Sequence, residues 1–509
     1  MINAVGRDIP ENILEQTGKD IFRGSYYCDN RQYTKAAPTV RGFCDPHHSK
    51  LVNSIREALL RCGIKDGMTL SFHHHFRGGD KIVNMVMDEV HSMGIRDITI
   101  CSSSLGTAHD PIIPYIEDGT ITMIYSSGVR GNIGRAISTG KLKHTAIMYS
   151  HGGRVRAIEE GSIHIDIAFI GAPTSDECGN LRAIGGKSDC GVLSYAYADA
   201  QYADKVVAII PASISMVNVD YVCRVDSIGA PEKIATGAAK PTTDQRKLLM
   251  AKYCSDFVSC TPYFKDGFIY QTGVGGASIA STVYLAEEMR KRNIHMRLGL
   301  GGISAPMVHL MEEGLIELLV DTQDFDLEAV HSIQEHPDKH IEITCSEYAN
   351  PLNKGAYVNK LDFVILAALE VDIHFNCNVV TDSSGIITGA QGGHPDTAAG
   401  AKCTIIMTPL LQGRSPAVCT DVTTVTTPGE TVDVVITDHG IAINPARPDL
   451  IEAATASGLH IQTIEELRDL AYSIAGEPEK ISFGNRIVGI IEARDGSIID
   501  VVRQYKPVE

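Results

Sequence analysis

Apolar residues recur along this chain at two spacings, one typical of strands and one typical of helices. Residues 206–210 are apolar at every position, which is typical of a strand buried on both faces of a sheet. Further strands are predicted at 68–72, 97–101, 120–125, 146–149, 166–170, 363–367, 404–407 and 432–437. Helical spacing is clearest where Ile82, Val86, Val90 and Met93 form one apolar face that ends at Gly94.

The alternation of strands and helices determines the expected fold class. A chain that alternates in this way forms a mostly parallel sheet with helices on both faces. A length of 509 residues favours more than one core, and the composition changes between Gly229 and Gln245. We therefore predict an α/β protein with an N-terminal extension (1–44) and two similar α/β domains (45–232 and 233–509), with the functional site between them.

The segment between strand 68–72 and the helix that follows it concentrates polar groups. Asp80 is the predicted N-cap of that helix, and the candidate site residues before it are His73, His74, His75, Arg77, Gly78 and Gly79. Backbone N–H groups converge where a glycine turn enters a helix, and the helix dipole adds partial positive charge. Such a turn suits a small polycarboxylate or a developing oxyanion. Adjacent histidines on one loop rarely converge on one ion, so no metal site is predicted, and a purely structural loop is the other alternative.

Two further arginines follow predicted strands in the same way. Arg130 comes after strand 120–125, and Arg154 comes after strand 146–149 in the segment that begins at His151. Because the carboxyl ends of parallel strands line the ligand crevice of an open α/β sheet, Arg77, Arg130 and Arg154 are expected to share one pocket. The alternative for each arginine is an ordinary surface position.

Three more glycine loops are candidates for close backbone approach to a ligand. None of them matches a Walker sequence or a complete dinucleotide-binding pattern. Nucleotide binding, an oxyanion hole and a simple tight turn therefore all stay open. Their glycines are Gly273, Gly275 and Gly276 after a strand that begins at Phe268, Gly301 and Gly302 in a predicted turn before helix 307–315, and Gly392 and Gly393.

Candidate nucleophiles are less distinctive. The chain has no G-x-S-x-G elbow. Cys101, Cys178 and Cys345 are possible nucleophiles, although small buried hydrophobic roles are more typical of such cysteines. Glu347 and Glu370 are candidate carboxylates, each with a structural role as the favoured alternative.

Charge and cysteine content narrow the class of partner and the compartment. A net charge of -17 argues against nucleic acid and membrane surfaces as partners, so an anionic substrate needs a local basic pocket. No apolar run approaches the roughly 18 residues of a membrane span, and the polar N-terminus lacks the apolar region of a secretory signal. The 13 cysteines are scattered without a C-x-x-C pair, which favours a reducing cytoplasm.

Several segments resemble known families. Residues 166–180, 367–372, 389–396 and 435–442 resemble family I CoA-transferases. Residues 71–80, 270–278 and 437–448 are more similar to the citrate lyase alpha subunit family, whose members are citrate:acetyl-ACP transferases. The resemblance covers about residues 45 to 509.

The resemblance implies two CoA-transferase-like domains and an exchange of acyl groups. Acetyl-S-ACP and citrate would give citryl-S-ACP and acetate, and the citrate lyase beta subunit (citryl-ACP lyase) would then cleave citryl-S-ACP to oxaloacetate. The gamma (acyl carrier) subunit would carry the thioester on a phosphoribosyl-dephospho-CoA prosthetic group, with CoA or acetyl-CoA as an analogue. No cofactor would be bound directly by this chain, which would form a homo-oligomer within a larger complex.

One departure from family I CoA-transferases affects the expected mechanism. Their nucleophilic glutamate follows the second glycine loop, whereas residues 298–304 of this chain contain no glutamate. A direct route, in which a citrate carboxylate attacks the thioester, needs only positioning, charge neutralisation and an oxyanion hole. The expected oxyanion and thioester loops contain Gly78, Gly79, Gly392 and Gly393. Citrate is expected to be bound by His73, His74, His75, Arg77, Arg130 and Arg154. The alternatives are a conventional CoA-transferase or acyl-CoA hydrolase that uses Glu347 or Glu370, and a non-catalytic assembly subunit.

Overall fold

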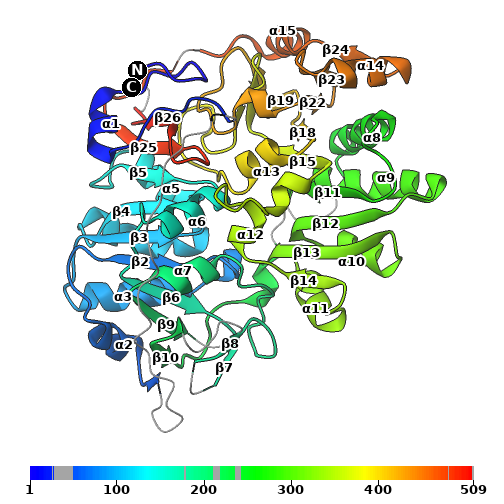
Figure 1. Ribbon diagram of the computed structural model, residues 1–509. Coiled ribbons are helices and arrows are strands. Elements are labelled where there is room, and N and C mark those ends of the chain that lie inside the picture. The colour runs from blue at the N-terminus through cyan, green and yellow to red at the C-terminus, as the bar shows by residue number, and fades with distance from the viewer. Residues whose placement is uncertain are drawn as a thin grey trace.

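The computed structural model describes residues 1–25, 27, 50–176, 179–209, 218–235, 242–479 and 481–506. It contains a 10-stranded sheet and a 9-stranded sheet, each flanked by helices, and the two lie next to each other in Figure 1. Almost all neighbouring strands within the two sheets are parallel; the antiparallel pairs are one hairpin in each sheet. The predicted α/β class with mostly parallel sheets is therefore confirmed.

The first sheet is built from both ends of the chain. Its strands lie in the order β1 (Leu51–Val52), β10 (Tyr221–Cys223), β9 (Lys205–Ile209), β6 (Ile167–Gly171), β2 (Thr69–Phe72), β3 (Ile98–Ser102), β4 (Ile121–Ser126), β5 (Ala146–Met148), β25 (Ile487–Glu492) and β26 (Ile498–Arg503). The associated helices are α2 (Ile55–Cys62), α3 (Ile82–Ser92), α4 (Ile113–Glu117), α5 (Gly131–Ser138), α6 (His151–Glu160) and α7 (Ala196–Tyr202). Three short 3-10 helices lie at Arg77–Gly79, Thr107–Ile112 and Pro231–Lys233.

The second sheet follows the same plan. Its strands lie in the order β14 (His340–Glu342), β13 (Ile316–Asp324), β12 (Met296–Ile303), β11 (Phe268–Thr272), β15 (Phe363–Ala367), β18 (Cys403–Met407), β22 (Val434–Thr437), β23 (Gly440–Ile443) and β24 (Ile461–Gln462). Its helices are α8 (Gln245–Cys260), α9 (Gly276–Arg292), α10 (Ala305–Glu312), α11 (Leu327–Glu335), α12 (Cys345–Ala349), α13 (His394–Gly400), α14 (Pro448–Ala456) and α15 (Ile464–Ala475). Two 3-10 helices lie at Tyr357–Lys360 and Gly429–Thr431.

Short strands outside the two large sheets shape the connecting loops. A three-stranded sheet joins β17 (Cys377–Asn378), β16 (Glu370–Asp372) and β21 (Val418–Cys419). Two ribbons pair β19 (Leu411–Gln412) with β20 (Ser415–Pro416), and β7 (Thr174–Ser175) with β8 (Leu181–Arg182).

The two ends of the chain lie side by side, and the labels N and C are adjacent in Figure 1. Helix α1 (Glu11–Thr17) belongs to an N-terminal segment that packs on the C-terminal hairpin. Asn3 Nδ2 donates to the carbonyl of Ile499 at 2.5 Å, and Lys19 forms an ion pair with the buried Glu492 at 2.5 Å. The described part of the predicted extension therefore packs on the main body, while residues 26 and 28–49 lie outside the described residues.

The predicted domain division and the sheets differ in one respect. Residues 236–241, at the predicted break, lie outside the described residues. Strands β25 and β26 are distant in sequence from the first half, yet they extend its sheet, with Ile490 opposite Ile147 of β5. The local pattern of these strands gives no indication of which sheet they join, because both sheets accept an apolar edge strand.

The predicted glycine turn at 298–302 is wrong, because these residues form the end of strand β12. Its glycines are required by close packing rather than by a turn. A Cβ on Gly302 would lie 2.0 Å from the ring of Phe325, and a Cβ on Gly301 would lie 2.5 Å from the Gln271 side chain. Gly301 has a φ of +97°, and the register shifts between Gly301 and Gly302. The glycines thus bring neighbouring side chains close to this strand end.

Asp80 is not the cap of helix α3. The N-cap is Lys81, which makes no capping hydrogen bond with its side chain. The carboxylate of Asp80 instead bonds His109, with 2.9 Å between Oδ2 and Nε2. This buried contact ties the turn after β2 to the 3-10 helix Thr107–Ile112, so the carboxylate positions a loop.

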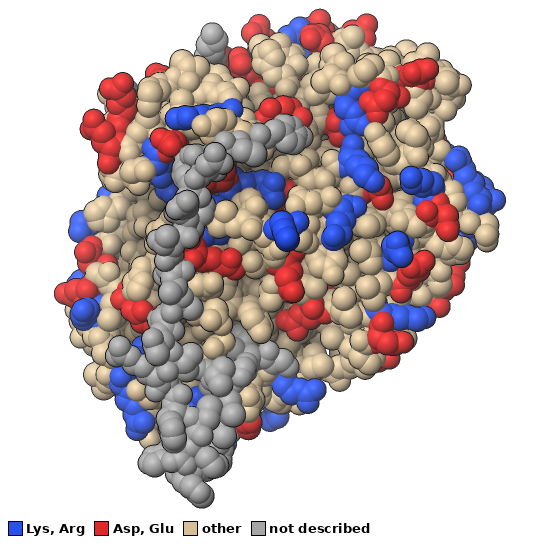
Figure 2. All heavy atoms as spheres, viewed as in Figure 1, with Lys and Arg blue, Asp and Glu red and all other residues tan. Residues whose placement is uncertain are grey.

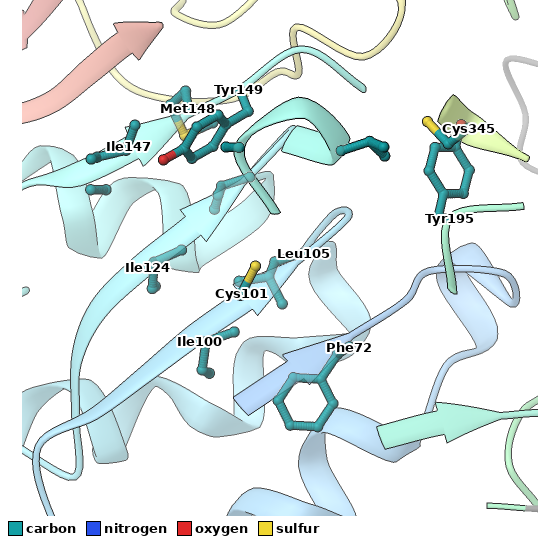
Figure 3. Close-up of a cluster of buried hydrophobic side chains, with 14 of the residues drawn as sticks. Phe72, Ile100, Cys101, Leu105, Ile124, Ile147, Met148, Tyr149, Tyr195 and Cys345 are labelled. Carbon is teal, nitrogen blue, oxygen red and sulfur yellow. The ribbon is translucent and has the colours of Figure 1, made fainter. Parts of the chain in front are cut away.

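The core of the first half includes apolar side chains near the carboxyl ends of its strands. Figure 3 shows Phe72, Cys101 and Ile124 on adjacent strands, and Tyr195 close to Cys345 of the second half.

On the face in Figure 2, basic and acidic side chains are interspersed, so the negative net charge is not gathered into one acidic patch there. Among the described residues, no helix combines the length and the apolarity needed to cross a membrane.

Candidate functional site

The turn after β2 is the centre of the candidate site, and contacts on both sides hold it in place. Arg77 has a φ of +48°, which is uncommon for a residue with a side chain. Its N–H donates to the carbonyl of His74 at 2.9 Å, and the N–H of Gly79 donates to Phe76 at 2.7 Å. A Cβ on Gly79 would lie 2.4 Å from the carbonyl oxygen of Ala230. The glycine therefore allows two backbone segments to touch, and Arg77 is set at the tip of a fixed turn.

Ser103, at the end of strand β3, orients the middle histidine of the turn. The hydroxyl of Ser103 accepts the backbone N–H of His74 at 3.1 Å and lies 2.6 Å from Nδ1 of the same residue. When the hydroxyl proton is donated to Nδ1, the neutral ring carries its own proton on Nε2. Burial holds the pKa of His74 well below its ordinary value, and a proton on the neighbouring His151 would lower it further. His74 is thus a neutral hydrogen-bond donor near pH 7.

The side chains of Arg77 and Arg130 form an electropositive cluster with His74. Burial lowers the pKa of Arg77 to about 10, and the positive charge of Arg130 lowers it further. Arg130 lies at the N-cap of α5, and its guanidinium lies 3.4 Å from the hydroxyl of Ser104. Among the described residues, Arg130 forms no ion pair. Arg77 is half-buried and Arg130 is exposed, and two neighbouring guanidinium groups of like charge favour an anion between them.

Arg154 has a different environment from that expected for a substrate-binding residue. Its guanidinium makes two hydrogen bonds to the Asp199 carboxylate, at 2.9 and 2.7 Å, and both side chains are buried. It also contacts Ser71 and Cys101. The charge of Arg154 is therefore neutralised within the first sheet, and the guanidinium ties β2 and β3 to α7.

His151 and Tyr195 are site residues that the sequence analysis did not single out. The ring of His151 stacks on His74 with centroids 6.1 Å apart, and Tyr195 lies 4.7 Å from His151 and 5.3 Å from His74. His151 is the first residue of α6, directly after β5. The rule that polar residues after parallel strands line a crevice would have identified it. Tyr195 carries no such signal, because it follows a loop.

His73 and His75 lie on either side of His74 in the same turn. Their rings stack with centroids 5.5 Å apart, and His73 Nε2 lies 3.9 Å from Asp199. Burial lowers the pKa of His73 to about 4 and that of His75 well below its ordinary value. Both rings are thus neutral near pH 7, and they connect the turn to the pair formed by Arg154 and Asp199.

The second half of the chain closes the site through the loop at 389–394. The N–H of Val129 donates to the carbonyl of Gly389 at 3.1 Å, and the N–H of His151 donates to Gly392 at 2.8 Å. Gly392 has a φ of +52°, and a Cβ there would lie 3.5 Å from His151 Nε2. Directly after β13, Phe325 places its ring 5.0 Å from the guanidinium carbon of Arg77. The arginine and histidine cluster therefore lies where the two halves meet.

Asp396 of helix α13 fixes this contact between the halves. Its carboxylate accepts the N–H of Gly152 at 2.9 Å and the hydroxyl of Ser150 at 2.9 Å. Arg494 pairs with the same carboxylate at 3.0 Å. A negative charge at the N-terminus of α6 is favourable, so the contact sets the position of His151 relative to the Gly392 loop.

The candidate oxyanion glycines differ in the availability of their N–H groups. The N–H of Gly79 is donated to Phe76, and that of Gly392 is donated to the carbonyl of Ser127 at 3.3 Å. Gly78 lies within the short helix Arg77–Gly79, and Gly393 is the N-cap of α13, where a Cβ would lie 2.6 Å from the hydroxyl of Tyr348. Gly78 and Gly393 are consequently the better candidates of the four.

The other predicted glycines lie at strand ends of the second sheet. Gly275 is the N-cap of α9 and Gly276 is its first residue. The N–H of Gly273 donates to the carbonyl of Ile365 at 2.8 Å. Gln271, which packs against Gly301, donates to the Tyr348 hydroxyl at 2.7 Å. Tyr348 therefore connects the strand ends beside Gln271 and Gly301 with Gly393, because its hydroxyl accepts from Gln271 and lies next to Gly393.

The candidate nucleophiles have partners outside the arginine and histidine cluster. Glu347 forms the capping box of α12 with Thr344. Glu370 accepts hydrogen bonds from Asn378 at 2.8 Å and from the N–H of Thr423 at 2.8 Å. Cys101 and Cys345 are buried; burial raises the pKa of Cys101 to about 11 and that of Cys345 well above its ordinary value, so neither is a thiolate near pH 7. Cys178 lies outside the described residues.

The buried histidines predict a specific pH dependence of stability. Burial lowers the pKa of His151 to about 3, whereas an unfolded histidine titrates near 6.5. The unfolded chain then binds one more proton than the native chain between these two pH values, so stability falls as pH falls below about 6.5. His151→Asn should remove about 1.4 kcal/mol per pH unit from this slope. Denaturant unfolding at pH 5.0, 5.5, 6.0 and 7.0 measures the slope.

The matched control is His164→Asn, because the His164 ring is 54% exposed and pairs with Asp204 at the surface. This control variant should keep the wild-type slope. An unchanged slope in His151→Asn as well would mean that His151 is not held neutral in the native protein.

The chain is similar to known proteins in both sequence and structure. Residues 48–505 match the family model "Citrate lyase, alpha subunit (CitF)". The citrate lyase alpha chain of Haemophilus influenzae is 50% identical over 466 residues, which cover 90% of this chain and 93% of that protein. A solved structure of a citrate lyase alpha subunit from Streptococcus mutans in complex with citrate has a TM-score of 0.95 and 47% identity, with 99% of this chain and 100% of that chain covered. A 4-hydroxybutyrate CoA-transferase from Porphyromonas gingivalis, 18% identical with a TM-score of 0.53 over 83% of this chain and 96% of that chain, shares the fold.

Proposed function

Since the chain belongs to the citrate lyase alpha subunit family, we propose that it exchanges acetyl for citryl on an acyl carrier thiol at the meeting point of its two halves. Acetyl-S-carrier and citrate give citryl-S-carrier and acetate. The single observation that carries the assignment of the site is the cluster of Arg77, Arg130, His74 and His151. Citrate is a trianion near pH 7, and this cluster offers it two guanidinium groups and neutral donors. The citrate complex of the Streptococcus mutans relative supports the choice of substrate.

The chemistry proceeds in two displacements without a protein nucleophile. A citrate carboxylate oxygen attacks the acetyl carbonyl, and the carbon–sulfur bond breaks. This step releases the carrier thiolate and forms a mixed anhydride of citrate and acetate. The thiolate then attacks the citryl carbonyl of the anhydride, the carbon–oxygen bond breaks, and acetate leaves. Both tetrahedral intermediates carry an oxyanion, and the N–H groups of Gly78 and Gly393 are the proposed donors to it. Arg77 and Arg130 hold citrate, and His74 donates from Nε2.

The glycine loops of the second sheet are the proposed path for the carrier arm. Gly273, Gly275 and Gly276 lie at the start of α9, and Gly301 and Gly302 lie at the end of the neighbouring strand β12. The arm is a phosphoribosyl-dephospho-CoA group on the gamma subunit, and the beta subunit then cleaves citryl-S-carrier. The chain works in the cytoplasm as part of a homo-oligomer within this complex.

The direct route predicts that no covalent acyl-enzyme forms during turnover. Borohydride or hydroxylamine added during turnover should leave every glutamate unmodified in peptide mass spectra. Glu347→Gln and Glu370→Gln should keep kcat within about threefold of wild type, because Glu347 bonds Thr344 of its own helix cap and Glu370 bonds Thr423, both outside the arginine and histidine cluster. A modified glutamate would support the conventional CoA-transferase mechanism. A chain that releases no acetate from acetyl-carrier and citrate in the absence of the other subunits would support an assembly role.

A further inference from the structure

A second buried polar cluster lies apart from the arginine and histidine cluster, at the ends of β13 and β14. It consists of Asp321, Asp324 and His340, whose side chains are essentially inaccessible to solvent. His340 Nε2 lies 3.2 Å from Asp321 Oδ2. One nitrogen or oxygen atom from each of the three residues lies within 4.8 Å of the corresponding atom of the other two. This spacing brings three metal-ligating atoms to a common point.

Each of the three side chains is oriented by a hydrogen bond at its other polar atom. The N–H of Gln323 donates to Asp321 Oδ1 at 2.7 Å, and the N–H of Val192 donates to Asp324 Oδ2 at 2.9 Å. The hydroxyl of Ser332 lies 3.0 Å from His340 Nδ1. These contacts leave Asp321 Oδ2 facing His340 Nε2, and they leave Asp324 Oδ1 buried without a donor. Hydrogen bonds to the outer atom of a ligand are typical of metal sites.

The cluster lacks a positive charge that would balance its carboxylates. Asp324 Oδ1 is buried and has no hydrogen-bond donor among the described residues. Within the described ranges, neither aspartate forms an ion pair with a lysine or an arginine. Two facing carboxylates in a buried place need either a shared proton or a bound cation.

We propose that Asp321, Asp324 and His340 bind one divalent transition-metal ion, Zn²⁺ or Mn²⁺, in a structural site. Two carboxylates neutralise a divalent charge, and one imidazole with two carboxylate oxygens is a ligand set that suits these ions. A metal–ligand distance of about 2.0–2.2 Å places neighbouring ligand atoms of a tetrahedral site about 3.3–3.6 Å apart, close to the 3.2 Å between His340 Nε2 and Asp321 Oδ2. The buried position is typical of structural metal sites rather than catalytic ones.

The proposed ion would stabilise the contact between the two halves of the chain. Val192 donates to Asp324, and Leu193 donates to Glu342 at 2.7 Å. Two residues later, Tyr195 packs against His74 and His151. The ion is thus linked to the arginine and histidine cluster through one short segment, and it takes no part in the acyl exchange.

The test is the metal content of the full-length protein, purified without chelator and measured by inductively coupled plasma mass spectrometry. Wild type is expected to hold about one equivalent of zinc or manganese per chain. Overnight dialysis against a chelator should remove the ion and lower Tm by about 5 °C or more, and addition of Zn²⁺ or Mn²⁺ alone should restore Tm. The double variant Asp321→Asn, Asp324→Asn should purify without the ion, and its Tm should not respond to chelator.

The surface cluster of His164, Asp166 and Asp204 supplies a matched control. It offers the same residue types at similar spacing, but it is largely exposed. Asp204→Asn should leave the metal content and the response to chelator unchanged. Wild-type protein with less than a tenth of an equivalent of any divalent metal, even after incubation with Zn²⁺ or Mn²⁺, would overturn the proposal and assign a shared proton to the two aspartates.

Discussion

Replacement of Arg77 by glutamine is expected to lower kcat/KM for citrate by about 30- to 5,000-fold, because a desolvated arginine–carboxylate contact is worth roughly 2–5 kcal/mol. Arg77 lies at the tip of a fixed turn, and burial with the charge of Arg130 lowers its pKa to about 10, so it stays charged near pH 7. The KM for acetyl-carrier should change far less, since the acetyl thioester is uncharged and offers no carboxylate to Arg77. Initial rates of acetate release, with each substrate varied in turn, separate the two effects.

Two variants make this result specific to the planar guanidinium. Arg77→Lys keeps the charge but loses the bidentate contact, so it should recover only part of the citrate affinity. Arg135→Gln, on the exposed face of α5, should behave as wild type. An equal rise in KM for citrate and acetyl-carrier in Arg77→Gln would show that Arg77 does not select citrate.

Replacement of Arg154 by methionine is expected to cost about 3–5 kcal/mol of unfolding free energy, because Asp199 would be left buried without its partner. Both side chains of this pair are 0–1% exposed, and the pair carries two hydrogen bonds below 3 Å. Urea unfolding followed by circular dichroism measures the loss. The surviving folded protein should keep its KM for citrate within about threefold, since Arg154 is neutralised by Asp199 and not by substrate.

The control for Arg154 is an exposed ion pair of similar geometry. Arg290 and Glu313 lie 2.6 Å apart at the surface, and Arg290→Met should leave the urea midpoint almost unchanged. A partial rescue is expected when Asp199→Asn is combined with Arg154→Met, because the uncompensated charge is then removed. A large rise in KM for citrate without loss of stability in Arg154→Met would show that Arg154 binds citrate.

The candidate site shows how far local sequence rules extend. The rule that polar residues follow parallel strands placed Arg77 and Arg130 together, and the structure brings both to His74. The same rule included Arg154, but the partner of Arg154 is 45 residues away and belongs to a helix that the rule does not consider. Position after a strand therefore predicts proximity to the crevice, while the partner of a charge depends on the packing of other elements.

The sequence by itself determined the α/β class, most strand positions and the segment at 71–80, because these depend on hydrophobic periodicity and on short motifs that are local in the chain. Only the tertiary structure decided that β25 and β26 complete the first sheet, that Asp80 bonds His109, and that Gly301 and Gly302 lie in a strand. It also brought Asp321 and His340 together and placed His151 beside Gly392. These contacts join residues distant in the chain, and their energies depend on burial and on the neighbours present. Hydrophobic spacing contains no information about either quantity.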